Sequence, residues 1–271
     1  MEAQTGPIFL TYRHRGPIDK FTAAVKKRTP VYDFRTEDGV SHTVWQIIDP
    51  AEISFLKKEF DRVNHIYIAD GHHRAASALS VSRRRAASGA GKGLSDFVFS
   101  VLFPDNSVNI ISYNRVVKDL HGLDVPAFLK ALAGSFDVVE SPQGRSPRKV
   151  HEMGMYLKGK WHLLEVPPAL LSGRDAVRSL DTSLLQECVL SPILGIADPR
   201  TDKRIRFVGG SRGTRELEKL VDSGEFAVAF HLYPTSISQV MEVADEGKIM
   251  PPKSTWFEPK LRDGIFVHLI K

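Results

Sequence analysis

Residues 65–85 have the sequence HIYIADGHHRAASALSVSRRR, and this stretch decides how the first part of the chain folds. The β-branched and aromatic run at 65–69 predicts a buried strand, and the helix formers at 75–85 predict a helix. Asp70 and Gly71 lie between them and are typical turn residues. The sequence therefore predicts a strand that leads through a tight turn directly into a helix.

The turn carries four polar side chains in the sequence Asp70-Gly71-His72-His73-Arg74. The first N–H groups of a helix have no partner within it and attract anions. Gly71 lets the backbone approach a ligand, and Arg74 can bind phosphate oxygens through two donors. Asp70 can cap the helix, hold Mg²⁺ or accept a proton. An ordinary Asp-Gly turn with an aspartate cap is the alternative, and it needs no ligand.

The composition is that of a globular protein, with 271 residues, 42% hydrophobic and 25% charged. No apolar run reaches the roughly 18 residues of a membrane span, and the first residues show no secretion signal. The single cysteine, Cys188, excludes an intramolecular disulfide and fits a reducing compartment. We therefore expect a cytoplasmic protein with no membrane partner.

The net charge of +5 raises the question of a polyanionic partner. Part of the excess comes from the run Arg83-Arg84-Arg85 at the predicted end of a helix, where cations interact well with the helix dipole. Nucleotide phosphates need far less positive charge than a duplex does. The charge therefore favours a nucleotide over a nucleic acid as an anionic partner, and the sequence is compatible with a homo-oligomer.

Hydrophobic periodicity and turn residues predict a mixture of strands and helices throughout the chain. Asp49, followed by Pro50, predicts the start of a helix through about residue 63, and Asp181 predicts the cap of another helix through residue 190. Expected strands lie at 7–12, 31–34, 40–48, 96–103, 108–112, 136–140, 155–157, 161–166, 205–208, 226–233 and 265–270. Further helices are expected at 18–27, 126–133, 215–221 and 237–244.

A shift in composition near residues 118–124 predicts a domain boundary. We expect a first domain at 1–118 with the 70–74 turn, a second α/β unit at 119–246, and a loop with a closing strand at 247–271. The fold class is α+β. In the second unit, residues 209–214 (GGSRGT) form another strand, glycine loop and helix start, a weak anion-binding signal.

The segment 250–255 (MPPKST) contains two consecutive prolines, which predict a rigid extended loop. This loop and the residues after it present Lys253, Ser254, Thr255 and Lys260. Two lysines, two hydroxyls and an aromatic residue suit contacts with a triphosphate and a purine. A structured surface loop without a ligand is the alternative.

Three blocks of sequence resemble one family: residues 67–74 (YIADGHHR), 39–45 (GVSHTVW) and 250–260 (MPPKSTWFEPK). They are similar to the bacterial and archaeal domain-of-unknown-function family ten-fifteen, over essentially the whole chain. Around the D-G-H-H-R motif this family is similar to the free-serine kinases of the ParB/sulfiredoxin fold. The resemblance implies a ParB/sulfiredoxin-like N-terminal core.

The resemblance also implies a nucleotide-dependent phosphotransferase that acts on free L-serine or a similar small hydroxyl metabolite. Gly71, His72, His73 and Arg74 would contact the phosphates of ATP or ADP, and Asp70 would support Mg²⁺ or the substrate hydroxyl. Phosphoryl transfer depends on positioning and charge neutralisation, which such a set supplies. Sulfiredoxin chemistry is not expected, because His72 stands where that reaction needs a cysteine.

The printed sequence departs from the family pattern before the strand at residues 7–12. Family members carry a further region there with an Arg-His-Glu-Thr-like segment, and in the kinases an N-terminal glutamate is the base for the serine hydroxyl. The alternative expectation is therefore an N-terminally shortened member that binds nucleotide as a non-catalytic regulatory protein.

Overall fold

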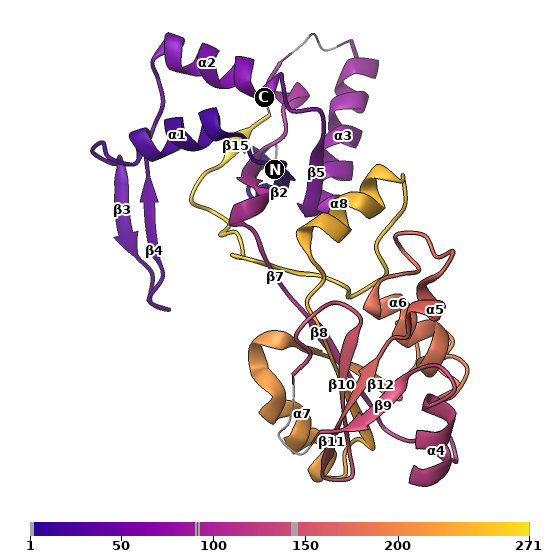
Figure 1. Cartoon of the computed structure of the whole chain (residues 1–271). Coiled ribbons are helices and arrows are strands. Elements are labelled where there is room, and N and C mark those ends of the chain that lie inside the picture. Colours follow the sequence, from indigo (N-terminus) through magenta and orange to yellow (C-terminus); the bar gives the residue numbers. More distant parts are fainter. Residues whose placement is uncertain (1–2, 90, 92, 142–145, 271) are drawn as a thin grey trace. The chain divides into compact units, whose positions relative to one another are not determined.

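The computed structural model describes residues 3–89, 91, 93–141 and 146–270, and these form two compact units (Figure 1). Unit 1 contains Met1–Val108 with Lys260–Lys271, and unit 2 contains Asn109–Pro259. Helices and separate sheets of mainly antiparallel strands confirm the α+β class. The division differs from the boundary expected at 118, because strand β8 (Tyr113–Val117) pairs with strands of unit 2. The segment expected as one piece at 247–271 is shared between the two units.

The sheet of unit 1 has β2 (Ile8–Tyr12) between β5 (Ile66–Asp70) and β6 (Ser100–Pro104). Strand β2 runs antiparallel to β5 and parallel to β6. The expected strand before the turn is confirmed, but it is buried on one face only. Tyr67 and Ala69 are buried, whereas Ile66 and Ile68 are 46% and 38% exposed. This alternation follows from the two-residue period of a strand with one covered face.

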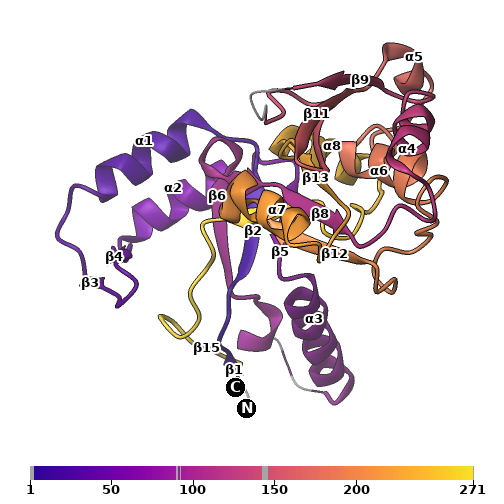
Figure 2. The same ribbon diagram turned by 90° about the horizontal axis from the view of Figure 1, so that it is seen from below.

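Helices α1 (Gly16–Val25) and α2 (Pro50–Phe60) lie side by side, with the hairpin of β3 (Tyr32–Arg35) and β4 (Ser41–Val44) at one end (Figure 2). The predicted cap is confirmed, because the Asp49 carboxylate accepts hydrogen bonds from the N–H groups of Ala51 and Glu52. The buried Glu59 carboxylate pairs with Arg15 and Arg62. The Asp49 cap and the ion pairs of Glu59 therefore add to the packing between α1 and α2.

Helix α3 (His72–Ala87) follows β5 after a single residue, and none of its side chains is fully buried. The chain ends return to unit 1, where β1 (Ala3–Gln4) pairs antiparallel with β15 (His268–Leu269). The expected closing strand is thus much shorter than residues 265–270. The expected strand at 96–103 is also shorter, since Leu94–Asp96 forms a 3₁₀ turn before β6.

Unit 2 is built on a six-stranded antiparallel sheet in the order β12-β8-β13-β10-β11-β9. The remaining strands are β9 (Asp137–Glu140), β10 (Glu152–Leu157), β11 (Lys160–Glu165), β12 (Ile205–Gly209) and β13 (Val228–Leu232). A separate ribbon pairs β7 (Asn109–Ile111) with β14 (Trp256–Glu258). Residues 142–145, in the segment between β9 and β10, lie outside the described residues.

Both faces of this sheet are covered (Figure 1). One face buries Val117, Met155 and Phe230 with α4 (Val125–Leu132) and α6 (Asp181–Leu185). The other face buries Val116, Tyr156 and Ala229 with α7 (Gly213–Asp222). Neighbouring residues of one strand thus enter different cores, and the sheet has to be apolar on both sides. The remaining helices of unit 2 are α5 (Pro168–Leu171) and α8 (Ile237–Asp245).

Asp181 does not cap its helix as the sequence predicted. The N-cap residue is Leu180, and the Asp181 carboxylate is buried and accepts the N–H of His151 at 3.0 Å. Burial raises the pKa of this carboxyl to about 7. The predicted helix at 181–190 continues beyond α6 as a π-helical turn, Gln186–Leu190, and the partly buried Cys188 in this turn packs against the core.

Among the described residues, no helix combines the length and the apolar character that crossing a membrane requires.

Candidate functional site

Gly71 forms the turn between β5 and α3. It has φ +95° and is the N-cap residue of the helix. This left-handed conformation is favourable for glycine and strained for other residues. It turns the chain sharply at the end of β5. The side chains of His72 and His73 are exposed in the first turn of α3, and Arg74 is partly exposed. The sequence signal at 70–74 therefore corresponds to a real strand, turn and helix start.

The N-terminus of α3 has no side-chain cap within the described part of the chain. No acidic residue lies in its first turn, and the first hydrogen bond of the helix runs from the N–H of Ala75 to the carbonyl of Gly71 at 2.9 Å. The N–H groups of residues 72–74 therefore point out of the helix end. Such a helix end has a partial positive charge and can bind a phosphate or carboxylate.

Asp70 is placed beside this helix end but does not cap it. Its Oδ1 accepts the N–H of Gly71 at 2.8 Å, and its Oδ2 lies 3.7 Å from the Nζ of Lys260. Both side chains of this ion pair are about half exposed, at 50% and 48%. Tertiary structure thus brings the Lys260 side chain to the 70–74 turn.

Arg74 folds back over the turn. A Cβ atom on Gly71 would lie 3.0 Å from the Nε of Arg74, and one on Gly6 would lie 2.9 Å from its Nη1. Nη1 also lies 3.7 Å from the Oδ1 of Asp263 in an exposed ion pair. Glycines at positions 6 and 71 leave the space that the guanidinium occupies.

A cavity of about 280 Å³ opens beside Arg74 in unit 1. The face of α3 formed by Ser77, Ala78 and Val81 lines one side of it, and Thr5 and Ser95 contribute hydroxyls. This face of α3 borders the cavity and is not fully covered by other side chains, which agrees with the absence of fully buried residues in the helix. The cavity can hold a small polar molecule next to the guanidinium group.

Lys253, Ser254 and Thr255 belong to unit 2, whereas the 70–74 turn belongs to unit 1. The main chain of Lys253 is left-handed, with φ +54°. Ser254 is buried, and its hydroxyl donates to the carbonyl of Pro251 at 2.7 Å and lies 3.3 Å from the Thr182 hydroxyl. Ser254 thus holds the loop internally, and nucleotide contacts by Ser254 and Thr255 stay a prediction.

Arg115 is a buried residue of this region that the sequence analysis missed. It is 4% exposed, and burial lowers its pKa to about 9. Its guanidinium donates to the carbonyls of Tyr113 and of Lys253, the latter at 3.0 Å. An arginine directly before the two valines of β8 was the available signal, because arginine is almost never fully buried without a partner.

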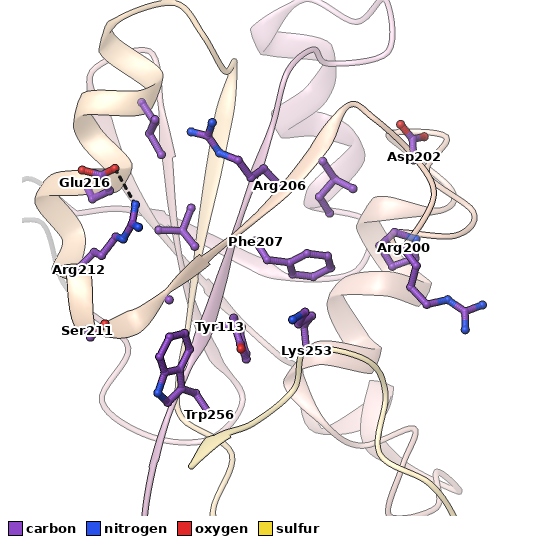
Figure 3. A pocket seen from close by; sticks show the side chains of 15 residues that line it. Tyr113, Arg200, Asp202, Arg206, Phe207, Ser211, Arg212, Glu216, Lys253 and Trp256 are labelled. Atoms are coloured by element: carbon purple, nitrogen blue, oxygen red, sulfur yellow. Dashed lines mark ion pairs between the residues drawn. The ribbon is translucent and has the colours of Figure 1, made fainter. Parts of the chain in front are cut away.

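A pocket of about 760 Å³ lies on unit 2 beside the end of β12 (Figure 3). It is lined by aromatic and charged residues from segments far apart in sequence: Tyr113, Arg200, Asp202, Arg206, Phe207, Ser211, Arg212, Glu216, Lys253 and Trp256. We call it the aromatic pocket. The glycine loop at 209–214 and the proline loop at 250–255 both contribute to it.

The glycines of that loop have a packing role. A Cβ on Gly209 would lie 3.0 Å from the Trp256 ring, and one on Gly210 would lie 2.7 Å from the carbonyl oxygen of Ser112. Gly-Gly thus lets the end of β12 approach the β7–β14 ribbon closely. The described residues contain no group of three His, Cys, Asp or Glu side chains placed to hold a metal ion.

The profile of a family described as "Protein of unknown function (DUF1015)" matches residues 1–183, which confirms the resemblance to family ten-fifteen. No curated protein matches the sequence. Among solved structures, a conserved hypothetical protein from Pyrococcus furiosus is 16% identical with a TM-score of 0.40, over 97% of this chain and 80% of that one. A free serine kinase in complex with AMP is 15% identical with a TM-score of 0.42, over 99% and 95%. C-terminally truncated SbnI from Staphylococcus aureus is 12% identical with a TM-score of 0.44, over 99% and 88%.

Proposed function

We propose that this chain, which belongs to the DUF1015 family of proteins of unknown function, binds nucleotide phosphates at the N-terminus of α3 and transfers a phosphoryl group to a small hydroxyl substrate. The observation that carries the proposal is the uncapped helix end after the left-handed Gly71. A phosphate there would accept hydrogen bonds from main-chain N–H groups and interact favourably with the helix dipole.

Side chains around the helix end supply additional positive charge. Arg74 can exchange its exposed contact with Asp263 for phosphate oxygens, because an exposed ion pair at 3.7 Å is weak. His72 and His73 are exposed in the same turn and can donate to phosphate. This set suits a donor such as ATP or ADP, whose transfer chemistry requires charge neutralisation more than covalent catalysis.

Asp70 is the residue proposed for Mg²⁺ or for the substrate hydroxyl. Magnesium in phosphoryl-transfer sites is usually held by one or two carboxylates together with phosphate oxygens, so a single aspartate at this position fits. The ion would neutralise charge on the phosphates when bound. Asp70 would have to exchange its contact with Lys260 for the ion, and the Lys260 side chain lies close enough to this turn to contact a bound phosphate.

The cavity beside Arg74 supports a small substrate. Its volume of about 280 Å³ and its hydroxyl-bearing lining suit an amino acid or a similar polar metabolite better than a macromolecule. L-serine, the substrate expected from the sequence, is the first candidate to test.

A second candidate function is nucleotide binding without transfer, as in a regulatory protein. It is favoured by the contacts of Asp70, since one oxygen accepts the Gly71 N–H and the other pairs with Lys260. In this arrangement both oxygens of Asp70 already have a polar neighbour, so a role in holding the turn accounts for the residue without a substrate hydroxyl.

Phosphorus NMR on the chain with Mg²⁺, ATP or ADP, and L-serine tests the proposal. A new phosphoserine resonance supports transfer, and Asp70→Asn should abolish it while the melting transition is retained. Calorimetry should show that Arg74→Ala weakens nucleotide binding by about 1.5–3 kcal/mol, the range for a charge-assisted hydrogen bond. Arg84→Ala, in the last turn of the same helix, is the matched control and should bind normally.

Each negative result has a separate meaning. Nucleotide binding without transfer, sensitive to Arg74→Ala, would favour the regulatory candidate. If Arg74→Ala and wild type bind nucleotide equally well, or if neither binds, the assignment of the α3 terminus is wrong.

A further inference from the structure

The aromatic pocket of unit 2 contains a lysine in an unusual setting. Lys253 has φ +54°, a conformation that is uncommon for a residue with a side chain and that costs about 1 kcal/mol or more. Its ammonium group lies 5.3 Å from the centre of the Tyr113 ring. A strained residue needs support from its surroundings, and at functional sites such strain often positions a side chain.

Buried polar contacts supply that support. The buried guanidinium of Arg115 donates to the carbonyl of Lys253 at 3.0 Å. On the other side, the carbonyl of Ser254 accepts the Thr235 hydroxyl at 3.2 Å, and the Ser254 hydroxyl donates to Pro251. These hydrogen bonds hold the main chain at Lys253 and Ser254 on its buried side, and the Lys253 side chain is exposed.

The charges around the pocket distinguish Lys253 from its neighbours. Each arginine of the lining pairs with a carboxylate: Arg200 with Asp198 at 2.9 Å, Arg206 with Glu225 at 2.8 Å and Arg212 with Glu216 at 3.6 Å. Within the part of the chain that the structure describes, no carboxylate lies within ion-pair distance of Lys253. Lys253 is thus a cation of the pocket lining that an anionic ligand can bind without breaking an ion pair with a described residue.

Aromatic rings surround the ammonium group. Figure 3 shows Lys253 among Phe207, Tyr113 and Trp256, while the Arg200 guanidinium points away from them. The centres of the Trp256 and Tyr113 rings lie 5.4 Å apart, and the ring planes meet at 51°. Gly209 packs closely against the Trp256 ring. Flat rings of a ligand can stack on such surfaces, which is a common way of binding nucleobases.

We propose that the aromatic pocket binds a nucleoside phosphate, with its phosphate on Lys253 and its base among Trp256, Tyr113 and Phe207. The volume of about 760 Å³ accommodates a mononucleotide. The inference concerns unit 2 alone and does not depend on the proposed role of the α3 terminus. It assigns binding and no chemical step.

The test uses the full chain and AMP, adenosine and inorganic phosphate as probes. AMP should quench tryptophan fluorescence, and Trp256→Phe should remove that quench while calorimetry still detects AMP. Lys253→Gln should weaken AMP binding at least about tenfold, because the phosphate loses its charged partner. Adenosine should bind wild type and Lys253→Gln alike, and phosphate alone should bind more weakly than AMP.

Lys158→Gln is the matched control. Lys158 is an exposed lysine of unit 2 with φ +48°, so the substitution changes the same charge on the same kind of backbone outside the pocket. It should leave AMP affinity unchanged. Proton NMR of each variant verifies that the fold is intact.

Several outcomes would overturn the inference. One is equal AMP affinity in folded Lys253→Gln and wild type, and another is an AMP quench that survives Trp256→Phe. Tighter binding of a thymidine oligonucleotide than of AMP would make the pocket a single-strand groove instead. Failure of the α3 proposal is separate, since it appears as insensitivity to Arg74→Ala.

Discussion

The guanidinium of Arg115 donates a 3.0 Å hydrogen bond to the carbonyl oxygen of Lys253 and so joins strand β8 to the proline loop. Its pKa, lowered to about 9 by burial, still leaves the group protonated at neutral pH. Among the described residues no carboxylate pairs with it. The buried charge is therefore stabilised by main-chain carbonyl dipoles, and the loop depends on it for its position.

Arg115→Met should lower the free energy of unfolding by about 1–3 kcal/mol, because the carbonyl groups of Tyr113 and Lys253 lose their donor inside the protein. Hydrogen exchange around residues 251–255 should accelerate as the loop loosens. Arg206→Met is the control, since its exposed pair with Glu225 contributes less than about 1 kcal/mol. Equal stability of the two variants would contradict a structural role for Arg115.

Gly71→Ala should cost about 1–2 kcal/mol of stability, because alanine is strained at φ +95°. Its Cβ would also press on the Arg74 guanidinium at 3.0 Å, so nucleotide affinity should fall as well. Gly89→Ala has a similar backbone, φ +79°, and open space around the new Cβ. It should lose comparable stability and keep its affinity. Calorimetry and thermal unfolding of both variants provide the comparison.

Ser254→Ala should destabilise the chain by about 1 kcal/mol, because the carbonyl of Pro251 loses its hydrogen bond. Nucleotide affinity should change little, since the hydroxyl is directed inward. Thr255→Val tests the neighbouring hydroxyl, which is only partly buried. A large loss of affinity in Ser254→Ala with unchanged stability would instead support the direct contact predicted from the sequence.

Asp181 should make the stability of the chain depend on pH. Its folded-state pKa of about 7 lies above the ordinary value of 3.8, so the folded state binds more protons between these values. Stability from this group is complete below the unfolded-state pKa and is lost as the pH rises through the folded-state pKa. From pH 5 to pH 8 the loss should be about 2.5–3 kcal/mol, since one pKa unit corresponds to about 1.4 kcal/mol.

Asp181→Asn should flatten this dependence, because the amide oxygen can still accept the His151 N–H without titrating. Scanning calorimetry at pH 5 and pH 8 measures the difference between the variant and wild type. Parallel changes in the two proteins would show that another group is responsible.

Local signals predicted much of the secondary structure. The Asp49-Pro50 start of α2 forms as expected, and so do the two strands on either side of Lys158 and Gly159. The strand, turn and helix at 66–87 are also confirmed. These features depend on main-chain conformations and caps that a few neighbouring residues decide. Asp181 failed as a cap because burial against His151 outweighed the local preference.

Long-range placement could not be predicted in this way. The sequence indicated a phosphate-binding loop at Lys253, Ser254 and Thr255. Only the structure shows that this loop lies beside Arg115 and that Lys253 lines a pocket with aromatic rings. Arg115 and Phe207 carried no motif. Their significance comes from strand pairing between β8 and β12, which no local pattern specifies.

The sequence by itself determined the α+β class, the turn at Gly71 and the residue types available to bind an anion, because these follow from local conformational preference and side-chain chemistry. Only the tertiary structure decided that Lys260 reaches Asp70, that Ser254 is buried, and that Lys253 stands among three aromatic rings above a buried arginine. Such contacts join residues distant in sequence, and the burial of apolar surface on both faces of the sheet brings them together.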